Sequence, residues 1–260
     1  MMATILDRLV ESTLEILAQR QNSTPLAHLK DMAAAQRPAR DFAVALSGPQ
    51  IRLIAEVKRA SPSKGVLNAS IDAQSQARSY EQAGAAAISV LTEPRYFQGS
   101  LADLAAVSSA VNVPALRKDF ILDPYQVYEA RAFGADAILL IAAILSDRQL
   151  AALLDITREL GMAALVEVHD RIELERTLRL DAVNVVGVNN RNLNDFTVEL
   201  QTTLVLRPLV REGIVVVSES GIHTRDDVLR LAAARVNAIL VGEALVTSPD
   251  PLTKIEELLA

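Results

Sequence analysis

The sequence alternates, eight times over, between a short apolar run and a longer stretch of helical character. Strands that are apolar on both faces and separated by helices are typical of a parallel sheet covered by helices. Eight such units predict an α/β protein with a closed (β/α)8 barrel, the TIM barrel, rather than an open sheet. The predicted strands are Leu53–Val57, Ala87–Leu91, Val113–Leu116, Ala137–Ile141, Ala163–Val166, Val183–Val188, Ile214–Val217 and Ala238–Val241.

The first 47 residues stand outside this repeat. Apolar residues recur close to a 3.6-residue period from Ile5 to Leu17, a break follows at Gln21–Pro25, and a second helical stretch covers Leu26–Gln36. Neither stretch has a strand partner nearby. We expect residues 1–47 to form a helical N-terminal extension packed on a barrel of residues 48–260, all within one domain of residues 1–260.

Glycine marks several of the predicted turns from helix to strand. Gly84, Gly134 and Gly161 stand where a helix ends in the left-handed conformation that glycine adopts without strain. The eighth unit has Arg235-Val236 at the position where glycine is expected.

Composition excludes several classes of function. A net charge of −6 argues against a nucleic-acid partner, which would require a basic surface. The chain has no cysteine, so disulfides and thiolate chemistry are excluded. Its three histidines form no His-x-x-x-His pair, so we expect no histidine-based metal site.

No segment has the character of a membrane span or a signal peptide. The longest apolar run, Ala137 to Leu145, is far shorter than the ~20 residues that a span requires. Charged residues such as Asp7, Arg8 and Glu11 interrupt the apolar N-terminal stretch. We expect a cytoplasmic, monomeric protein with no membrane partner.

Charged and polar residues gather where six of the predicted strands end. Active sites of β/α barrels lie at the carboxyl ends of the strands, whereas solvated surface charge would show no such preference. We therefore expect these side chains to converge in one site. They include Glu56, Lys58, Lys118, Glu167, Asn189, Arg191, Glu219, Ser220 and Glu243.

Glu56 and Lys58 are two residues apart on a strand, so both side chains point to one face. A purely structural pair is the alternative, but buried ion pairs stabilise a fold little compared with apolar packing. Lys118 and Glu167, which we place at neighbouring strand ends, favour the functional interpretation. A dry lumen would lower a lysine pKa and raise a glutamate pKa, matching both groups to proton transfer near neutral pH.

Two glycine-containing loops predict a phosphate site. Ser220-Gly221 follows the seventh strand and Gly242-Glu243 the eighth, where barrels frequently bind phosphate through backbone N–H groups. Either glycine alone would more often mark a tight turn. Ser61 and Lys64, after the first strand, add a hydroxyl and a charge.

Aromatic residues make up 3% of the chain, yet Tyr96-Phe97 and Phe120 follow predicted strands. This favours a flat, apolar ligand at the mouth of the barrel, although aromatic side chains in a barrel usually belong to its core. His169 lies at the rim, and His28 and His223 are surface or loop residues. We assign none of these histidines a catalytic role.

Taken together, these motifs resemble the indole-3-glycerol phosphate synthase family along nearly the whole chain. The most specific match is the run from Ile54 to Gly65, IAEVKRASPSKG, whereas the run from Val241 to Leu245 is shared with other phosphate-binding barrels. Other matches are Leu91-Thr-Glu93 with Tyr96 to Ser100, Arg117 to Ile121, Leu165 to His169, Gly187 to Leu193, and Ser218 to Ile222.

The resemblance implies closure of the indole ring in tryptophan biosynthesis, by a carbon–carbon carboxy-lyase that needs no metal or cofactor. The family's substrate is 1-(2-carboxyphenylamino)-1-deoxyribulose 5-phosphate, and its products are indole-3-glycerol phosphate, carbon dioxide and water. Attack on the ketone builds negative charge on oxygen, which a fixed ammonium stabilises best in a water-poor site.

The resemblance also implies roles for individual residues. Lys118 is similar to the family's general acid, Lys58 to the residue that holds the substrate carboxylate, and Glu167 to the acid or base of the dehydration. Glu56 matches the residue that orients the lysines and stabilises charge on the anilino nitrogen. Polar positions around the substrate match Asn189, Arg191, Glu219 and Ser220; the phosphate site matches Ser61, Gly221, Gly242 and Glu243; the walls around the aromatic ring match Pro62, Phe97, Phe120, Leu139 and Leu193.

Three alternatives remain open from the residues alone. Phosphoribosylanthranilate isomerase is a related phosphate-binding barrel, but it would want a cysteine as one partner of its acid/base pair. A Schiff-base aldolase would use Lys58 or Lys118 as the amine. A non-catalytic phosphate-binding barrel would leave the clustered titratable groups without a use.

Overall fold

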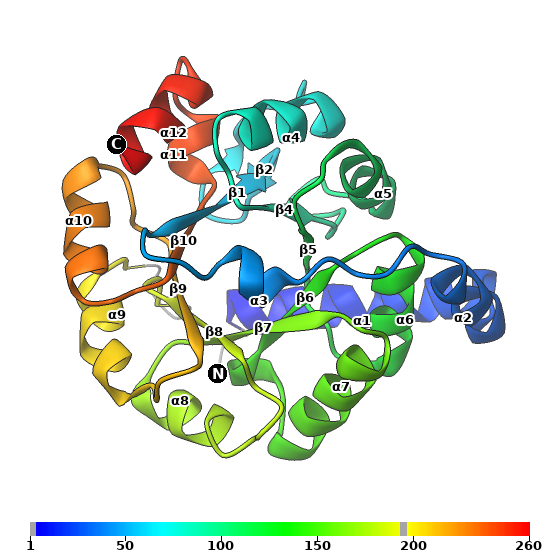
Figure 1. Cartoon of the computed structure of the whole chain (residues 1–260). Coiled ribbons are helices and arrows are strands. Elements are labelled where there is room, and N and C mark those ends of the chain that lie inside the picture. Colours follow the sequence, from blue (N-terminus) through cyan, green and yellow to red (C-terminus); the bar gives the residue numbers. More distant parts are fainter. Residues whose placement is uncertain (1–3, 193–196) are drawn as a thin grey trace.

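The computed structural model describes residues 4–192 and 197–260. Eight parallel strands close into a barrel in the order β1-β10-β9-β8-β7-β6-β5-β4 (Figure 1), which confirms the predicted fold class. A short hairpin of β2 and β3, Ala60–Ser61 and Gly65–Val66, lies in the loop after β1. The barrel strands are β1 (Arg52–Val57), β4 (Ala87–Leu91), β5 (Ala115–Lys118), β6 (Ala137–Ile141), β7 (Ala163–Val168), β8 (Val185–Asn189), β9 (Val215–Glu219) and β10 (Ala238–Val241).

Helices form a ring around the barrel. Most begin at an Asp, Ser or Thr whose side chain accepts a backbone N–H of the first turn, as Ser100, Ser146 and Thr224 do. The helices are α4 (Ala73–Gln82), α5 (Leu101–Ala110), α6 (Pro124–Ala132), α7 (Asp147–Glu159), α8 (Arg171–Thr177), α9 (Gln201–Leu206), α10 (Arg225–Ala233), α11 (Glu243–Val246) and α12 (Pro251–Leu259), with 3₁₀ turns η1 (Ala142–Ile144) and η2 (Arg207–Leu209).

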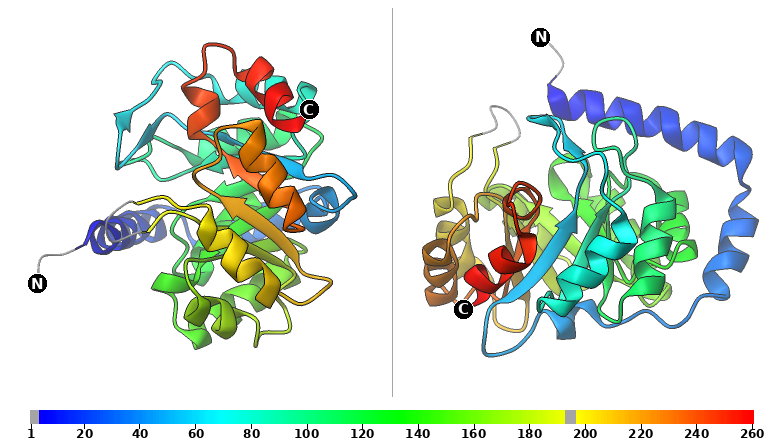
Figure 2. Two further views of the ribbon diagram at one scale, coloured as in Figure 1. Left: turned by 90° about the vertical axis from the view of Figure 1, so that its left-hand side faces the viewer. Right: turned by 90° about the horizontal axis from the view of Figure 1, so that it is seen from above.

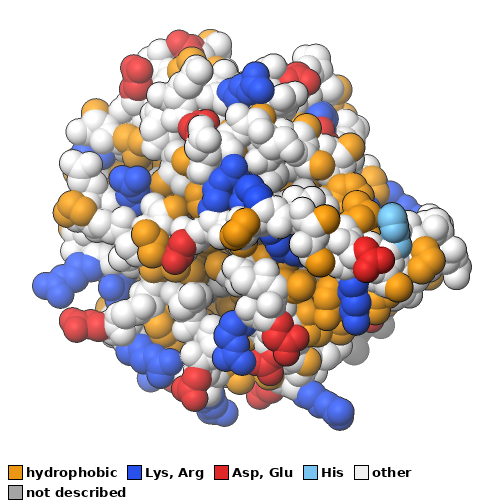
Figure 3. Space-filling model, turned by 45° about the vertical axis from the view of Figure 1, so that its right-hand side comes forward, with side chains coloured by type: hydrophobic (Ala, Val, Ile, Leu, Met, Phe, Trp, Pro, Cys, Tyr) orange, Lys and Arg blue, Asp and Glu red, His pale blue; other side chains and the backbone are white. Residues whose placement is uncertain are grey.

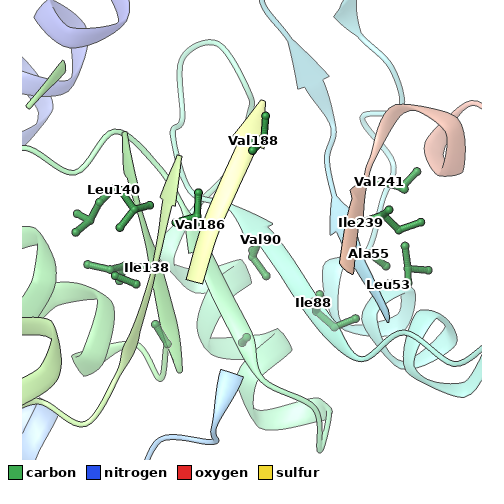
Figure 4. Packing of buried hydrophobic residues seen from close by; sticks show 14 of the residues in the cluster. Leu53, Ala55, Ile88, Val90, Ile138, Leu140, Val186, Val188, Ile239 and Val241 are labelled. Carbon is green, nitrogen blue, oxygen red and sulfur yellow. The ribbon is translucent and has the colours of Figure 1, made fainter. Parts of the chain in front are cut away.

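Side chains of alternating parity build two separate cores. One set faces outward and packs under the helices; Figure 4 shows Leu53, Ala55, Ile138 and Leu140 among this set. The other set faces the lumen. Because successive side chains of a strand point to opposite faces, a polar residue's parity decides whether it reaches the lumen. The lumen core contains Ile54, Ala87, Leu116, Leu139, Leu165, Val185, Val217 and Leu240.

The N-terminal extension wraps around the barrel from one end to the other (Figure 2). Helix α1 (Ile5–Ser23) crosses the end at which the strands terminate, and α2 (Leu26–Ala34) packs along α6. The short helix α3 (Phe42–Ala45) closes the opposite end, where fully buried Phe42 joins the lumen core. The helical extension predicted from the sequence therefore contributes to both ends of the barrel.

Polar contacts fix this extension in place. The Tyr125 hydroxyl of α6 donates to the carbonyl oxygens of Arg20 and Thr24, both at 3.0 Å. Near the other end of the barrel, the Arg37 guanidinium forms a bidentate salt bridge with the buried carboxylate of Asp136. Its Nη1 and Nη2 donate to Oδ1 and Oδ2 at 2.7 and 2.9 Å. The segment is attached by directional bonds as well as by apolar packing.

Element boundaries differ modestly from the predictions. Helix α1 runs on to Ser23, so the break shrinks to Thr24-Pro25. The third barrel strand begins two residues later than predicted, at Ala115, and continues to Lys118. Pro114 has no N–H with which to join the ladder on entry, which explains the later start.

The helix-to-strand turns follow the glycine pattern. Gly84, Gly134 and Gly161 have φ of +100°, +84° and +72°, as the left-handed end of a helix requires. Arg235 adopts the same conformation, with φ of +60°, although its Cβ makes this unfavourable. The eighth turn therefore has the same geometry as the others.

Acidic and basic side chains are interspersed with apolar ones on the face shown in Figure 3. In the part of the chain that the structure describes, no helix is both long enough and apolar enough to cross a membrane.

Candidate active site

The side chain of Lys118 lies at the centre of a cluster of carboxylates at the carboxyl ends of the strands. Its Nζ is 3.7 Å from Oε2 of Glu219 and 3.9 Å from Oε2 of both Glu56 and Glu167. Nζ of Lys58 lies 3.3 Å from Oε1 of Glu56. Each of these residues follows a lumen-facing apolar residue by two positions or extends that alternation, so the register of the strands brings them together.

One detail of the predicted arrangement is wrong. Lys118 ends β5 and Glu167 lies on β7, and β6 runs between these strands, so the two residues are not on neighbouring strands. They still meet because both point across the lumen rather than along the wall.

The titration behaviour of the cluster follows from its crowding. Burial alone would lower the pKa of Lys118, but the charges of Glu56, Glu219 and Glu167 outweigh it and raise that pKa. Burial alone would raise the pKa of Glu56, but the ammonium groups of Lys58 and Lys118 hold it below its usual value. The expected lowering of a lysine pKa is therefore wrong for Lys118, because carboxylates surround it.

The pKa values of Glu167 and Glu219 differ widely, as those of an acid/base pair do. Burial would raise the pKa of Glu167, but its contact with His169, the charge of Lys118 and the amide of Asn189 lower it to about 2. Burial and the nearby charge of Glu167 raise the pKa of Glu219 to about 8. The expected rise of a glutamate pKa holds for Glu219 and is wrong for Glu56 and Glu167.

Two glycines make room for these carboxylates. A Cβ at Gly187, on β8, would overlap Oε1 of Glu219, and one at Gly242 would crowd Oε1 of Glu56. Both glycines therefore allow a glutamate of the adjacent strand to turn into the lumen. Gly242, which the sequence analysis places in the phosphate site, has this second role.

Asn189 and Ser220 form a hydrogen-bonded link between β8 and the loop after β9. The Ser220 hydroxyl donates to Oδ1 of Asn189 at 2.9 Å, and Asn190 Nδ2 donates to the Ser220 carbonyl at 3.0 Å. Ser220 has φ of +66° and Gly221 has φ of +76°. A non-glycine residue in this region is strained, and such strain is often found at functional sites.

One of two adjoining cavities, here the apolar cavity, lies under helix α1. The rings of Phe97 and Phe120 face it with centroids 6.2 Å apart, and Lys58 Nζ lies 5.9 Å from the centroid of Phe97. This shape suits a flat ring close to a cation. Its apolar lining consists of Ile5, Leu6, Leu9, Pro62, Leu91, Phe97, Phe120, Leu139 and Ile141.

The second, the polar cavity, lies beside the loops after β9 and β10. Gly221, Gly242 and Glu243 line it, as does Lys64, whose Nζ pairs with Oε1 of Glu243 at 2.5 Å. Backbone N–H groups at glycines, with a lysine nearby, are a common way to bind phosphate. The two cavities share the lining residues Glu56, Lys58, Lys118, Arg191, Ser220 and Glu243.

The structure brings together nearly every residue singled out in the sequence. Those predicted for catalysis and for the ring walls line the apolar cavity, and Glu219 lines the polar one. Ser61 lies on the apolar cavity only, so among the residues after β1 it is Lys64 that reaches the polar cavity. Leu193 lies outside the described residues.

Sequence reasoning missed two contributors. Ile5, Leu6 and Leu9 of α1 form part of the cavity wall, although periodicity indicated only that their helix packs somewhere. His169 contacts Glu167, and its position two residues further along the chain was the available signal. His28 and His223 are exposed, as predicted, but His223 also lines the polar cavity.

Fold and site together define a β/α-barrel enzyme whose titratable side chains lie between an apolar cavity with aromatic walls and a polar cavity. The family model described as "Indole-3-glycerol phosphate synthase" matches residues 6–258. The chain belongs to the indole-3-glycerol phosphate synthase family. This confirms the resemblance, the carboxy-lyase class and the place in tryptophan biosynthesis that the sequence motifs predicted.

Individual relatives agree with the family match. An indole-3-glycerol phosphate synthase from Laribacter hongkongensis is 48% identical over the full length of both chains. One from Dehalococcoides mccartyi strain CBDB1 is 50% identical over 98% of this chain and 100% of its own. Roughly half of the positions are therefore shared along the whole length.

Solved structures at lower identity show the fold alone. 3-Hexulose-6-phosphate synthase superposes with a TM-score of 0.66 at 15% identity, covering 80% of this chain and 98% of its own. A chain of the tryptophan synthase complex of Pyrococcus furiosus superposes with a TM-score of 0.59 at 18% identity, covering 80% and 97%. Each superposition covers nearly the whole of the other protein and about four fifths of this chain.

Within residues 4–192 and 197–260, no three His, Asp or Glu side chains are placed so that they could hold a metal ion together. The carboxylates at the mouth are instead paired with the ammonium groups of Lys58 and Lys118.

Proposed function

We propose that the two cavities bind the two ends of 1-(2-carboxyphenylamino)-1-deoxyribulose 5-phosphate, and that the lysine–glutamate cluster between them closes the indole ring. The observation that carries this proposal is the position of Lys118, which lines both cavities where they meet. The aromatic ring fits between Phe97 and Phe120. The phosphate fits the polar cavity, held by backbone N–H groups at Gly221, Gly242 and Glu243.

Lys118 is the general acid of ring closure in this proposal. As the ring carbon attacks the ketone, the oxygen becomes an alkoxide and takes a proton from the Lys118 ammonium. A raised lysine pKa is no obstacle, because an alkoxide is a far stronger base than an amine. The surrounding carboxylates keep this lysine charged until the substrate needs the proton.

Lys58 and Glu56 interact with groups of opposite charge on the substrate ring, the carboxylate and the anilino nitrogen. Lys58 Nζ, close to the Phe97 ring, holds the substrate carboxylate, which leaves as carbon dioxide once the ring carbon has become tetrahedral. Glu56 orients both lysines and stabilises the positive charge that develops on the anilino nitrogen. Decarboxylation then restores the aromatic ring, because the pair of electrons of the broken bond neutralises that charge.

Dehydration completes the reaction. The carbon between the nitrogen and the new hydroxyl-bearing carbon loses a proton, and the hydroxyl leaves as water with a proton supplied by Lys58. Glu167 acts as acid or base in this step, and Asn189, Ser220, Glu219 and Arg191 hold the substrate around it. Ser61 and Pro62, with Leu139 and Leu193, complete the substrate contacts.

The charge state of Lys118 disfavours an aldolase. A Schiff base forms from a neutral amine, and three neighbouring carboxylates favour the ammonium instead. Borohydride with a carbonyl substrate should therefore leave no stable adduct on Lys58 or Lys118.

A direct assay tests the proposed function. The purified chain is mixed with the carboxyphenylamino-deoxyribulose phosphate, and the indole product is followed by absorbance and fluorescence. We expect turnover without added metal or cofactor. Binding without any product would leave a non-catalytic phosphate-binding barrel as the better description. The monomeric state, the cytoplasmic location and the single domain stay predictions, as does the absence of a nucleic-acid partner.

A further inference from the structure

His169 lies between two carboxylates beside the reaction centre. It follows Glu167 by two residues, so both side chains point to the same side of the chain. Its Nε2 is 3.3 Å from Oε1 of Glu167, and its Nδ1 is 3.1 Å from Oε2 of Glu173 on α8. Its side chain is only 12% exposed. One imidazole thus connects a lumen carboxylate to a carboxylate on the surrounding helix.

The second carboxylate is itself firmly held. The His169 backbone N–H donates to the same oxygen of Glu173 at 2.8 Å, and the Glu173 backbone N–H donates to Oδ1 of Asp170 at 2.9 Å. Glu173 therefore fixes the ring of His169 through both Nδ1 and the backbone. Its charge also acts on the imidazole from the side away from the lumen.

Only the protonated imidazole can offer an N–H to carboxylates on both sides. Burial alone would lower the pKa of His169, but Glu167 and Glu173 outweigh it and raise that pKa to about 10. The contact of Nε2 with Glu167 is an ion contact rather than an aligned hydrogen bond, since Nε2 has no hydrogen-bond partner among the described residues. The positively charged imidazole of His169 therefore lies next to the carboxylate of Glu167.

We propose that His169 is a positioning residue that keeps Glu167 ionised and oriented for the dehydration step. This rests on the proposed function and narrows the role of Glu167 within it. His169 itself touches no reacting atom in this proposal. It acts only through the carboxylate that it faces.

The proton balance of the step closes within the cluster. Glu167 takes the proton from the carbon beside the ring nitrogen, and the electron pair of that C–H bond becomes the new double bond as water leaves with a proton from Lys58. Lys118, left neutral by ring closure, lies 3.9 Å from Oε2 of Glu167. It can recover its proton there, which returns both groups to their starting charge. Lys58 regains its proton from solvent.

Charged groups on other strands of the barrel also face Glu167. Lys118 faces it from β5, and Glu219 from β9. Glu56 on β1 pairs with the same Lys118 ammonium. Of these, Lys118 and His169 favour the ionised form of Glu167, whereas Glu219 opposes it. Removing the imidazolium should therefore make Glu167 easier to protonate.

The variant His169→Gln tests this role. Glutamine keeps a hydrogen-bond donor but carries no charge. We expect the acid limb of the pH profile of kcat, which the pKa of Glu167 sets, to move upward by about one pH unit, with kcat at neutral pH and KM changed little. The matched control is His28→Gln, an exposed histidine on α2, which should leave the profile unchanged.

Glu173→Gln provides a second, independent variant. It leaves the imidazole in place but removes one of the charges that protonate it, so we expect a smaller shift in the same direction. Thermal melting of each variant shows whether the fold is kept. An acid limb that stays in place in His169→Gln, whatever the change in kcat, would overturn the positioning role. Failure of the wild-type chain to make the indole product would instead refute the proposed function.

Discussion

Arg117 and Lys118 are adjacent on β5 and show opposite ways of burying a cation. The Arg117 side chain faces outward, is fully buried, and pairs with Asp119 and Glu129 at 2.9 Å each. Lys118 faces the lumen, where its three carboxylate neighbours lie 3.7 to 3.9 Å away. Both oxygens of Glu219 lack a hydrogen-bond partner among the described residues.

The short, fully paired contacts of Arg117 suit a structural role, whereas the longer contacts of Lys118 suit a role in chemistry. The Arg117 guanidinium also donates to the Thr92 hydroxyl at 3.1 Å and to the Gln126 carbonyl at 2.9 Å, so much of its donor capacity is used. Through Glu129 it reaches Arg20 of α1, which joins three elements. In the Lys118 cluster the ion contacts are longer, and both oxygens of Glu219 remain available to a ligand. Tight pairing stabilises the native state, whereas loose pairing leaves polar groups available to the substrate.

The largest effect is expected from Lys118→Ala. Ring closure should fall by about 10³-fold or more, because the proton donor to the developing alkoxide is lost. Substrate binding should persist, since the walls and the phosphate site remain. Steady-state kinetics and ligand titration measure the two quantities.

Near-normal turnover in Lys118→Ala would refute the assignment of Lys118 as the general acid. The contrast between a structural Arg117 and a catalytic Lys118 would then be lost. Circular dichroism on the same sample shows whether the barrel is still folded.

Arg117→Met should affect stability first. Removing the guanidinium leaves the Asp119 and Glu129 carboxylates buried without their partner, which costs about 3–5 kcal/mol. Thermal unfolding measures this, with a Tm change of about 2–4 °C for each kcal/mol in a domain of this size. An unchanged Tm combined with a large loss of kcat would show that Arg117, too, serves the chemistry.

The variant Glu219→Gln tests the charge state of the Lys118 cluster through the pH dependence of the melting temperature. The folded-state pKa of about 8 lies above the ordinary value of 4.5, so the folded chain binds more protons and loses stability as pH rises between these values. The variant lacks this loss. We expect it to melt a few degrees above wild type at pH 8, and the difference to vanish near pH 4.5.

A melting difference that is the same at all pH values would contradict a raised pKa for Glu219. Kinetics on this variant also show whether its carboxyl group is needed for binding, through KM, or for turnover, through kcat.

The smallest effect is expected from Arg235→Gly, at a turn remote from both cations. Glycine relieves the positive φ but gains entropy in the unfolded chain, so the net stabilisation should be about 0.5 kcal/mol. Chemical denaturation measures it, and kcat should stay at the wild-type value. This variant shows how far stability can change when the ion pairs of Arg117 and Lys118 are both left intact.

The barrel was predictable because its signal is local and repeated. Runs such as Ala137–Ile141 and Ala238–Val241 match the observed strands residue for residue, since a strand buried on both faces is apolar throughout. The third strand was displaced because Val113 looks like a strand residue, whereas Pro114 breaks the ladder.

The candidate site was predictable where period-two alternation applies. Glu56, Lys118 and Glu167 continue lumen columns begun by Ile54, Leu116 and Leu165, so their convergence follows from parity. Their charge states did not follow, because a pKa depends on which strands face one another across the lumen. The contribution of α1 was also missed, since amphipathic periodicity does not show what a helix packs against.

The path of α1 has a practical consequence for handling this enzyme. Its first turn borders the apolar cavity through Ile5, Leu6 and Leu9, whereas the chain ends on α12 in the outer ring (Figure 2). A purification tag or fusion partner placed ahead of α1 would begin beside that cavity. One placed after Ala260 would begin away from it, so kinetic work is best done on a chain tagged at its carboxyl end.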